Sequence, residues 1–349
     1  MRLRSGSKRL ETKHEIIEVG VPTRNMLLSY ILGYIAFHLK LASLVKSNRY
    51  DCMILSNIFS PLIPVIARGR PIVFDYKDVY SLSASVPFKT PVRQFLYWVT
   101  RVFEQILFCF KMTVVVPSPS MQRVVRDRFN VDSVLISNGV NTELFHPISE
   151  STRAKVRAEL GILRGEFCLC YLGSIENWVD LEGVVQALLH LKSLRLIMIG
   201  GPPRSGEYMR HIMALCDKGG VSDRVIWTGF KKQAEAARIL SACDAAIVPF
   251  PLDRELSAVA LPDKVFEYLA SGVPVISTRL PDVEKLFRDY VYFYDTHEEL
   301  FRILSDLQAH MKRKCSASDQ LTQAEKYDWR RIAASYCALI VSLLTHGVN

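Results

Sequence analysis

A lysine and a glutamate, three positions apart at the start of a predicted helix, are the residues best placed to bind a phosphorylated ligand. Both follow Pro262, which suits the first position of a helix because its missing N–H costs nothing there. The unpaired N–H groups of Asp263, Lys264 and Val265 would then point at a phosphate, and Lys264 would add positive charge. Glu267, one turn on, could accept hydrogen bonds from a sugar hydroxyl. The two charged side chains could instead form a solvated surface pair worth ~0.3 kcal/mol.

The residues around this helix predict the elements that position it. Residues 245–250 read AAIVPF and predict a strand before the helix, and residues 273–276 predict a strand after it. Gly272 is placed to end the helix, and Pro274 prevents its continuation. In such a strand–helix–strand unit the helix begins at the carboxyl end of a parallel sheet, where α/β proteins bind anionic ligands.

The whole chain alternates predicted strands and helices. Its first part has a possible strand at 15–19, helices at 24–46, 91–110 and 121–129, and strands at 51–55, 71–75, 113–116 and 134–136. Its second part has strands at 167–172, 194–199, 224–227, 245–249, 273–276 and 291–294, with helices between them and a final helical region from 318 to about 344. This alternation predicts an α/β protein with parallel sheets covered by helices on both faces.

Composition narrows the class of protein. The 349 residues are 49% hydrophobic and 23% charged, and the net charge of +9 favours anionic partners such as phosphates or an anionic membrane. Eight cysteines without a Cys-x-x-Cys motif fit a reduced, cytosolic compartment. We expect no signal region at the N-terminus and no membrane-spanning segment. Dispersed histidines and the absence of an Asp-x-Asp pair predict no metal site.

The two helices predicted at 24–46 and 91–110 are unusually apolar and have basic residues near their ends. They could be ordinary buried helices of a Rossmann-like domain, with most of their apolar residues in the core. They could also form a surface for anionic lipid, for which Tyr97, Trp98 and Phe103 have suitable side chains.

The stretch from Pro262 to Val275 resembles the donor-binding segment of the retaining family 4 glycosyltransferases (glycosyl transferases group 1), written Pro-x-Lys-x-x-Glu-Tyr-x-Ala-x-Gly-x-Pro-Val. Every fixed position of that pattern is present. Residues 136–147 (ISNGVNTELFHP) are similar to the family's signature before the linker, residues 171–174 (YLGS) to its first glycine loop in the second domain, and residues 327–329 (YDW) to the segment before its last helix.

The resemblance implies the GT-B fold, in which two Rossmann-like, doubly wound domains face each other across a cleft. It divides the chain into an acceptor-side domain at 1–148, a nucleotide-sugar domain at 149–325 and a C-terminal helix at 326–349 that returns to the first domain. It implies a glycosyltransferase that acts with retention on a lipid-linked or glycan acceptor in cell-surface glycan or glycoconjugate biosynthesis. Neither a cofactor nor a nucleic-acid partner is expected. The protein would work in the cytoplasm, where it could also lie peripherally on the cytoplasmic face of a membrane.

The resemblance also assigns site residues. The nucleotide-sugar would be held by a set spread over three segments of the second domain: Gly173, Ser174, Gly229, Phe230, Leu261, Pro262, Asp263, Lys264 and Glu267. Catalytic roles would fall to Lys264, which stabilises the departing diphosphate, and to Lys77 and Asp78, which stand where many members have a histidine. Ordinary tight turns explain Gly229 equally well.

Four departures from the family pattern keep a second interpretation open. No glycine-rich loop precedes Arg24, so the first strand–helix unit is expected to be missing. Val259 stands at the position of the first of the family's paired glutamates, and the loop from Ser174 to Asp180 lacks the usual basic residues. Lys77 replaces a histidine, and a lysine is a poor general base near neutral pH. The chain could therefore be a non-catalytic homologue that pairs with an active transferase. A sugar-nucleotide epimerase on this fold is a weaker alternative, because no histidine cluster supports it.

Overall fold

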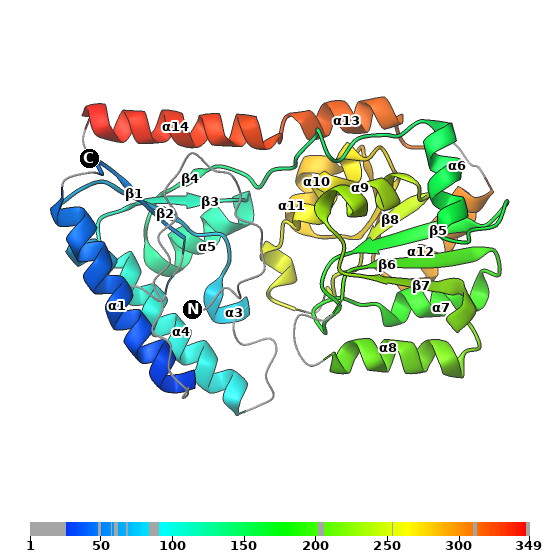
Figure 1. Ribbon diagram of the computed structural model, residues 1–349, viewed down its shortest axis with the longest axis horizontal. Coiled ribbons are helices and arrows are strands. Elements are labelled where there is room, and N and C mark those ends of the chain that lie inside the picture. Colours follow the sequence, from blue (N-terminus) through cyan, green and yellow to red (C-terminus); the bar gives the residue numbers. More distant parts are fainter. Residues whose placement is uncertain are drawn as a thin grey trace.

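The computed structural model describes residues 26–47, 50–56, 58, 62–67, 69–83, 91–201, 206–252, 254–309 and 313–346. The predicted strand at 15–19 lies outside these residues. The described chain forms two α/β domains with parallel sheets, side by side and joined by a linker and by the C-terminal helices (Figure 1). The predicted fold class is therefore confirmed.

The first domain has a four-stranded parallel sheet in the order β1 (Met53–Leu55), β2 (Ile72–Asp75), β3 (Thr113–Val116), β4 (Ser133–Leu135). Its helices are α1 (Met26–Lys46), α2 (Ile63–Ile66), α3 (Tyr80–Ser83), α4 (Val92–Phe108) and α5 (Pro119–Phe129). One face of this sheet forms a core in which buried residues of the strands pack against α4 and α5, including Phe74, Leu107 and Val125.

The second domain has a six-stranded parallel sheet in the order β10-β9-β8-β5-β6-β7. Its strands are β5 (Phe167–Leu172), β6 (Leu194–Ile199), β7 (Val225–Gly229), β8 (Ala245–Val248), β9 (Val275–Thr278) and β10 (Val291–Tyr294). Because strand order reverses between β5 and β8, the carboxyl ends of these two strands flank the crevice in which doubly wound sheets bind ligands.

Helices cover both faces of the second sheet. The helices of this domain are α6 (Glu150–Glu159), α7 (Glu182–His190), α8 (Glu207–Lys218), α9 (Gln233–Ser241), α10 (Asp263–Ala270), α11 (Pro281–Phe287), α12 (His297–Gln308) and α13 (Ala317–Glu325). Buried side chains of α9, α10 and α11 pack on one face, and those of α7, α8 and α12 pack on the other. β9 begins two residues later than predicted, since Pro274 lacks the N–H that a strand interior needs.

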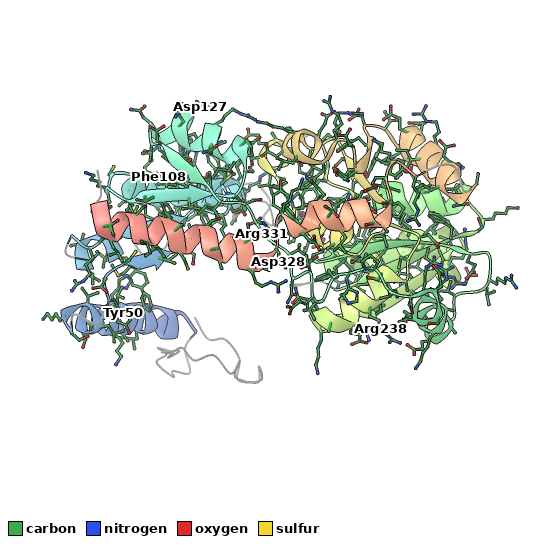
Figure 2. The ribbon with its side chains drawn as sticks, turned by 90° about the horizontal axis from the view of Figure 1, so that it is seen from above. Tyr50, Phe108, Asp127, Arg238, Asp328 and Arg331 are labelled. Atoms are coloured by element: carbon green, nitrogen blue, oxygen red, sulfur yellow. The ribbon has the colours of Figure 1, made fainter. Side chains whose placement is uncertain are left out.

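The final helical region is two helices rather than one. Between α13 and α14 (Trp329–His346) the chain leaves helical geometry, because the carbonyl of Tyr327 and the N–H of Trp329 pair with the backbone of Val140 in the linker. Helix α14 then covers the second face of the first sheet, where Ile332 contacts buried residues of β2 and β3. Figure 2 shows Asp328 and Arg331 at the junction of the two domains.

A buried carboxylate also joins the domains directly. Asp282, in the first turn of α11, is 1% exposed and accepts hydrogen bonds from the N–H (3.1 Å) and Oγ (2.9 Å) of Ser120 at the start of α5. Nearby, Val259 of the second domain packs against the core of the first. In the described part of the chain, every helix is too short or too polar to cross a membrane.

Candidate functional site

Helix α10 begins one residue later than its sequence predicts. Pro262 has an extended backbone (ψ 133°) and is the N-cap, so Asp263 is the first helical residue. The prediction that three N–H groups are free is also wrong, because the N–H of Val265 donates to the carbonyl of Pro262 (3.1 Å). No side chain caps this end of the helix. The N–H groups of Asp263 and Lys264 have no acceptor within the described residues, so they remain available to an anion.

The side chain of Lys264 lies over the loop that follows β5. A Cβ added at Gly173 would sit 2.2 Å from Cε and 2.9 Å from Nζ of Lys264, so a side chain there would displace the end of the lysine. Gly173 also has φ +147°, a conformation that other residues rarely adopt. The free end of α10, its lysine and the glycine loop therefore converge on one point.

The ends of β6 and β7 lie next to the loop that follows β5. A Cβ added at Gly200 would lie 2.1 Å from the carbonyl oxygen of Gly173, so the two backbones touch, and the N–H of Gly200 donates to the carbonyl of Gly229 (2.9 Å). Phe230 is 70% exposed, and its ring lies beside Gly201. The predicted residues Gly173, Gly229 and Phe230 are thus brought together through glycines that follow β6.

Two buried tyrosines fix the loop relative to the helix. The hydroxyl of Tyr268, in the middle of α10, accepts a hydrogen bond from the N–H of Leu172 (2.9 Å). The hydroxyl of Tyr171 donates to the carbonyl of Ser174 (2.7 Å). These contacts give the tyrosine of the Glu-Tyr pair a positioning role that sequence reasoning did not assign.

Glu267 occupies a setting that disfavours its charge. Burial raises the pKa of this carboxyl to about 7, a net value that includes the opposing charge of Lys264 and a smaller upward effect of Asp263. In the free protein the protonated form is favoured, so ionising Glu267 costs stability as the pH rises through 7. Hydrogen-bond donors from a ligand would offset that cost by stabilising the carboxylate.

The first domain contributes the opposite wall. Lys77 Nζ lies 3.2 Å from Oδ2 of Asp75, whose Oδ1 accepts a hydrogen bond from Tyr336 of α14 (2.8 Å). Burial raises the pKa of Asp78, although Ser83 and the backbone of Val79 hydrogen-bond its carboxyl. Lys77 is engaged in the ion pair with Asp75, which leaves Asp78 as the candidate for accepting a proton.

A buried glutamate supports this wall from inside the domain. Glu104 of α4 is fully buried, and its Oε1 accepts hydrogen bonds from the hydroxyl of Tyr76 (2.7 Å) and the N–H of Ser81 (3.1 Å). These residues flank Lys77 and Asp78 in sequence, so Glu104 holds both ends of the segment that carries them.

A cavity of about 340 Å³ lies between the two walls. Among the predicted site residues, Lys77, Asp78, Leu261 and Pro262 line it. The remaining lining residues, which were not predicted, are Ser83, Pro117, Met121, Asn138, Trp178, Phe250, Leu256, Val259 and Ala260. Asn138 also hydrogen-bonds Asp263 across the cleft. The other predicted residues, Gly173, Ser174, Gly229, Phe230, Asp263, Lys264 and Glu267, lie outside the cavity lining, at the sheet edge and on α10. Among the described residues, no group of three or more His, Cys, Asp or Glu side chains could hold a metal ion.

Replacing Gly200 by alanine should disrupt the backbone contact between Gly200 and Gly173. The added methyl group meets the carbonyl oxygen of Gly173 in a backbone with φ +129°, so we expect Gly200→Ala to lower the free energy of unfolding by about 2 kcal/mol or more. Gly220→Ala is the control, since that glycine also has positive φ but has no atom near its Cβ position. Urea denaturation of both variants checks the prediction. Equal losses of stability would show that the backbone contact does not matter.

Comparisons with known proteins identify the family and the fold. Residues 3–144 match the family described as Glycosyltransferase Family 4, and residues 166–306 match Glycosyl transferases group 1. The chain is similar to TuaH of Bacillus subtilis (strain 168), a glycosyltransferase assigned to teichuronic acid biosynthesis, with 29% identity over 161 residues. That match covers 46% of this chain and 37% of TuaH, so the chain spans little more than a third of that relative's length.

Solved structures show the same fold at low sequence identity. Sucrose-phosphate synthase from Thermosynechococcus elongatus superposes with a TM-score of 0.74 and 19% identity, over 93% of this chain and 81% of that one. HepE of Anabaena, solved with UDP and glucose, superposes with a TM-score of 0.71 and 18% identity, over 93% and 84% of the two chains. With two family matches that together span both domains, the chain belongs to the family 4, group 1 glycosyltransferases and has the GT-B fold.

Proposed function

We propose that this protein transfers a sugar from a nucleoside diphosphate donor bound in the cleft between its domains. The observation that carries the proposal is the convergence of the free end of α10, the Lys264 side chain and the Gly173 loop. Backbone N–H groups, a helix dipole and an ammonium group directed at one point suit a diphosphate. HepE, which shares the fold, was solved with UDP-glucose, and this supports a nucleotide-sugar as the donor.

The parts of such a donor can be assigned from their order along the site. The diphosphate lies at the start of α10, and the ribose reaches Glu267 one turn into the helix. The base lies toward Gly229 and Phe230, and the sugar enters the cavity beyond Leu261 and Pro262. We propose retention of configuration, with an oxygen of the leaving phosphate helping to accept the acceptor's proton.

Charge stabilisation is the main catalytic contribution that we propose. Lys264 and the N–H groups of α10 stabilise the negative charge that develops on the departing diphosphate. Lys77, paired with Asp75, adds positive charge from the facing wall, and Asp78 is placed to receive the acceptor's proton, which the leaving phosphate helps to remove. TuaH is assigned to the biosynthesis of teichuronic acid. By analogy, we propose a cell-surface glycan or its lipid-linked precursor as the acceptor.

The pH dependence of donor binding should follow Glu267. If ribose hydroxyls donate to its carboxylate, the affinity for UDP-glucose should rise by about tenfold between about pH 6 and about pH 8, because the carboxyl ionises over that range. UDP-glucose itself carries no group that titrates there. We expect Glu267→Gln to abolish the pH dependence and Glu267→Ala to weaken binding by about 1–3 kcal/mol.

Calorimetric titrations at several pH values measure these affinities. Glu235→Gln, on the surface of α9 and paired with Lys231, is the matched control and should keep the wild-type profile. Affinity that is constant or falls with rising pH in the wild-type protein would contradict the ribose assignment of Glu267.

We also propose that the reaction needs no metal ion, since a lysine and a helix end supply the positive charge. Release of UDP from a UDP-sugar, with or without acceptor, should therefore continue in excess EDTA. Complete loss in chelator with recovery in Mn²⁺ or Mg²⁺ would overturn this. Donor binding without any turnover in either condition would instead favour the non-catalytic homologue that assists an active transferase subunit.

A second proposal concerns the membrane and rests on the outer face of α4. Apolar side chains recur there at spacings of three and four residues and are widely exposed: Val92 (49%), Phe95 (67%), Trp98 (64%), Val102 (55%) and Ile106 (42%). These five residues are named the α4 stripe. A continuous apolar stripe on one helix face is unusual for a surface that meets only water. The interpretation that this face of α4 is core is therefore wrong.

The structure also refines which residues form this surface. Of the three aromatic residues that the sequence suggested, Trp98 is exposed, whereas Tyr97 is half-buried and Phe103 packs against the core of the first domain. Phe95 was missed.

The charges around the stripe suit an anionic bilayer. The only acidic residue of α4, Glu104, is buried, whereas Arg93 is exposed. Helix α1 has no acidic residue and exposes Lys40 and Lys46 together with apolar side chains such as Leu39. We therefore propose peripheral attachment to the cytoplasmic face of a membrane, where anionic lipids and a lipid-linked acceptor would be presented to the first domain.

Vesicle sedimentation tests the attachment. We expect binding to vesicles containing anionic lipid and little binding to neutral ones. We also expect release by ~1 M salt, which shortens the electrostatic screening length to ~3 Å. Replacing Phe95 and Trp98 by serine should reduce the bound fraction several-fold. The control replaces Val341 and Leu344, exposed apolar residues of α14, in the same way. Protein that stays in the supernatant with anionic vesicles at low salt would refute this proposal.

A further inference from the structure

The cavity between the domains has two chemically different walls. Every charged or amide side chain that lines it comes from the first domain: Lys77, Asp78 and Asn138. The second domain contributes side chains without a polar group, except for the indole N–H of Trp178, and these include Phe250, Leu256, Val259 and Leu261. The wall formed by Trp178, Phe250, Leu256 and Val259 is named the apolar wall.

The position of this cavity connects it with the donor sugar and rests on the proposed function. Leu261 and Pro262 line the cavity and lead directly into the first turn of α10, whose free N–H groups face the proposed diphosphate. The sugar of a nucleotide-sugar is bonded to the outer phosphate. Glu267 lies one turn further into the helix, on the ribose side, so the cavity is the space left for the sugar.

A sugar in this space finds hydrogen-bond partners on one side only. Lys77, Asp78 and Ser83 offer side-chain donors and acceptors from the first domain, but the side chains of the apolar wall offer only the indole N–H of Trp178. A hydroxyl turned toward that wall would lose its water without gaining a partner, which weakens binding by about tenfold or more. A methyl group in the same place would gain by burial against Phe250, Leu256 and Val259.

We propose that the donor sugar carries a methyl group on the edge that faces the apolar wall, as a 6-deoxy sugar or an N-acetylated sugar does. The two classes place the methyl group on different carbons but present the same chemistry to Val259 and its neighbours. A fully hydroxylated hexose is then a poor donor, because one of its hydroxyl groups faces the apolar wall without a partner.

Affinities for three donors that share one nucleotide test the proposal: UDP-glucose, UDP-6-deoxyglucose and UDP-N-acetylglucosamine, each measured against UDP alone. We expect one methyl-bearing donor to bind at least about tenfold more tightly than UDP-glucose, and the preferred one identifies the class. UDP-glucose that binds as tightly as both methyl-bearing donors, or more tightly, overturns the proposal. If UDP and all three donors fail to bind, the donor site is wrong and this inference falls with it, whereas UDP binding without a preference refutes the sugar class alone.

A near-isosteric variant locates the preference. Val259→Thr puts a hydroxyl into the apolar wall with little change in volume. The preference for the methyl-bearing donor over UDP-glucose should therefore shrink by about threefold or more, while the affinity for UDP stays constant. Val341→Thr, at an exposed position of α14, is the matched control and should leave the ratio unchanged. Because Val259 also packs against the core of the first domain, thermal unfolding of the variant is compared with wild type. A ratio that is unchanged in folded Val259→Thr would contradict the assignment.

Discussion

The backbone contact between Gly173 and Gly200 is the constraint on which the rest of the site depends. A Cβ at position 200 would collide with the Gly173 carbonyl, so glycine at that position allows the ends of β5 and β6 to meet, and a side chain at position 173 would displace the end of Lys264. Their contact brings the loop after β5 under the start of α10, and the Tyr268 hydroxyl keeps it there through the N–H of Leu172. The anion-binding character of the helix end becomes useful because this loop closes one side of it.

The second requirement is a fixed separation between the domains. Asp282 of α11 is buried against the start of α5, where it satisfies the N–H of Ser120 and faces the positive end of the helix dipole. On another side of the molecule, the linker at Val140 pairs with the turn before α14, and α14 covers the first sheet. These contacts bring Lys77 and Asp78 opposite Leu261 and Pro262, so that neither domain alone forms the cavity.

Much of this arrangement could be predicted from the sequence, because the signals are local. Alternating strands and helices, Gly272 as a helix end and Pro274 as a barrier to its continuation identify the fold and helix α10, although Pro262 proved to be the N-cap. Contacts between distant segments could not be predicted. Nothing in the sequence shows that Tyr268 reaches Leu172, or that Val259 faces the first domain. The exposure of Phe95 and the burial of Phe103 likewise depend on which face of α4 meets the sheet.

Titration of UDP into Lys264→Ala tests whether the start of α10 and its lysine bind the diphosphate. We expect a loss of affinity of about tenfold to a hundredfold, since a charge-assisted contact with phosphate disappears while the fold is unchanged. The lysine lies against Gly173 and is not part of either hydrophobic core of the second domain, so its removal should leave thermal unfolding close to wild type. Equal affinity for UDP in the variant and the wild-type protein would contradict the assignment of the site.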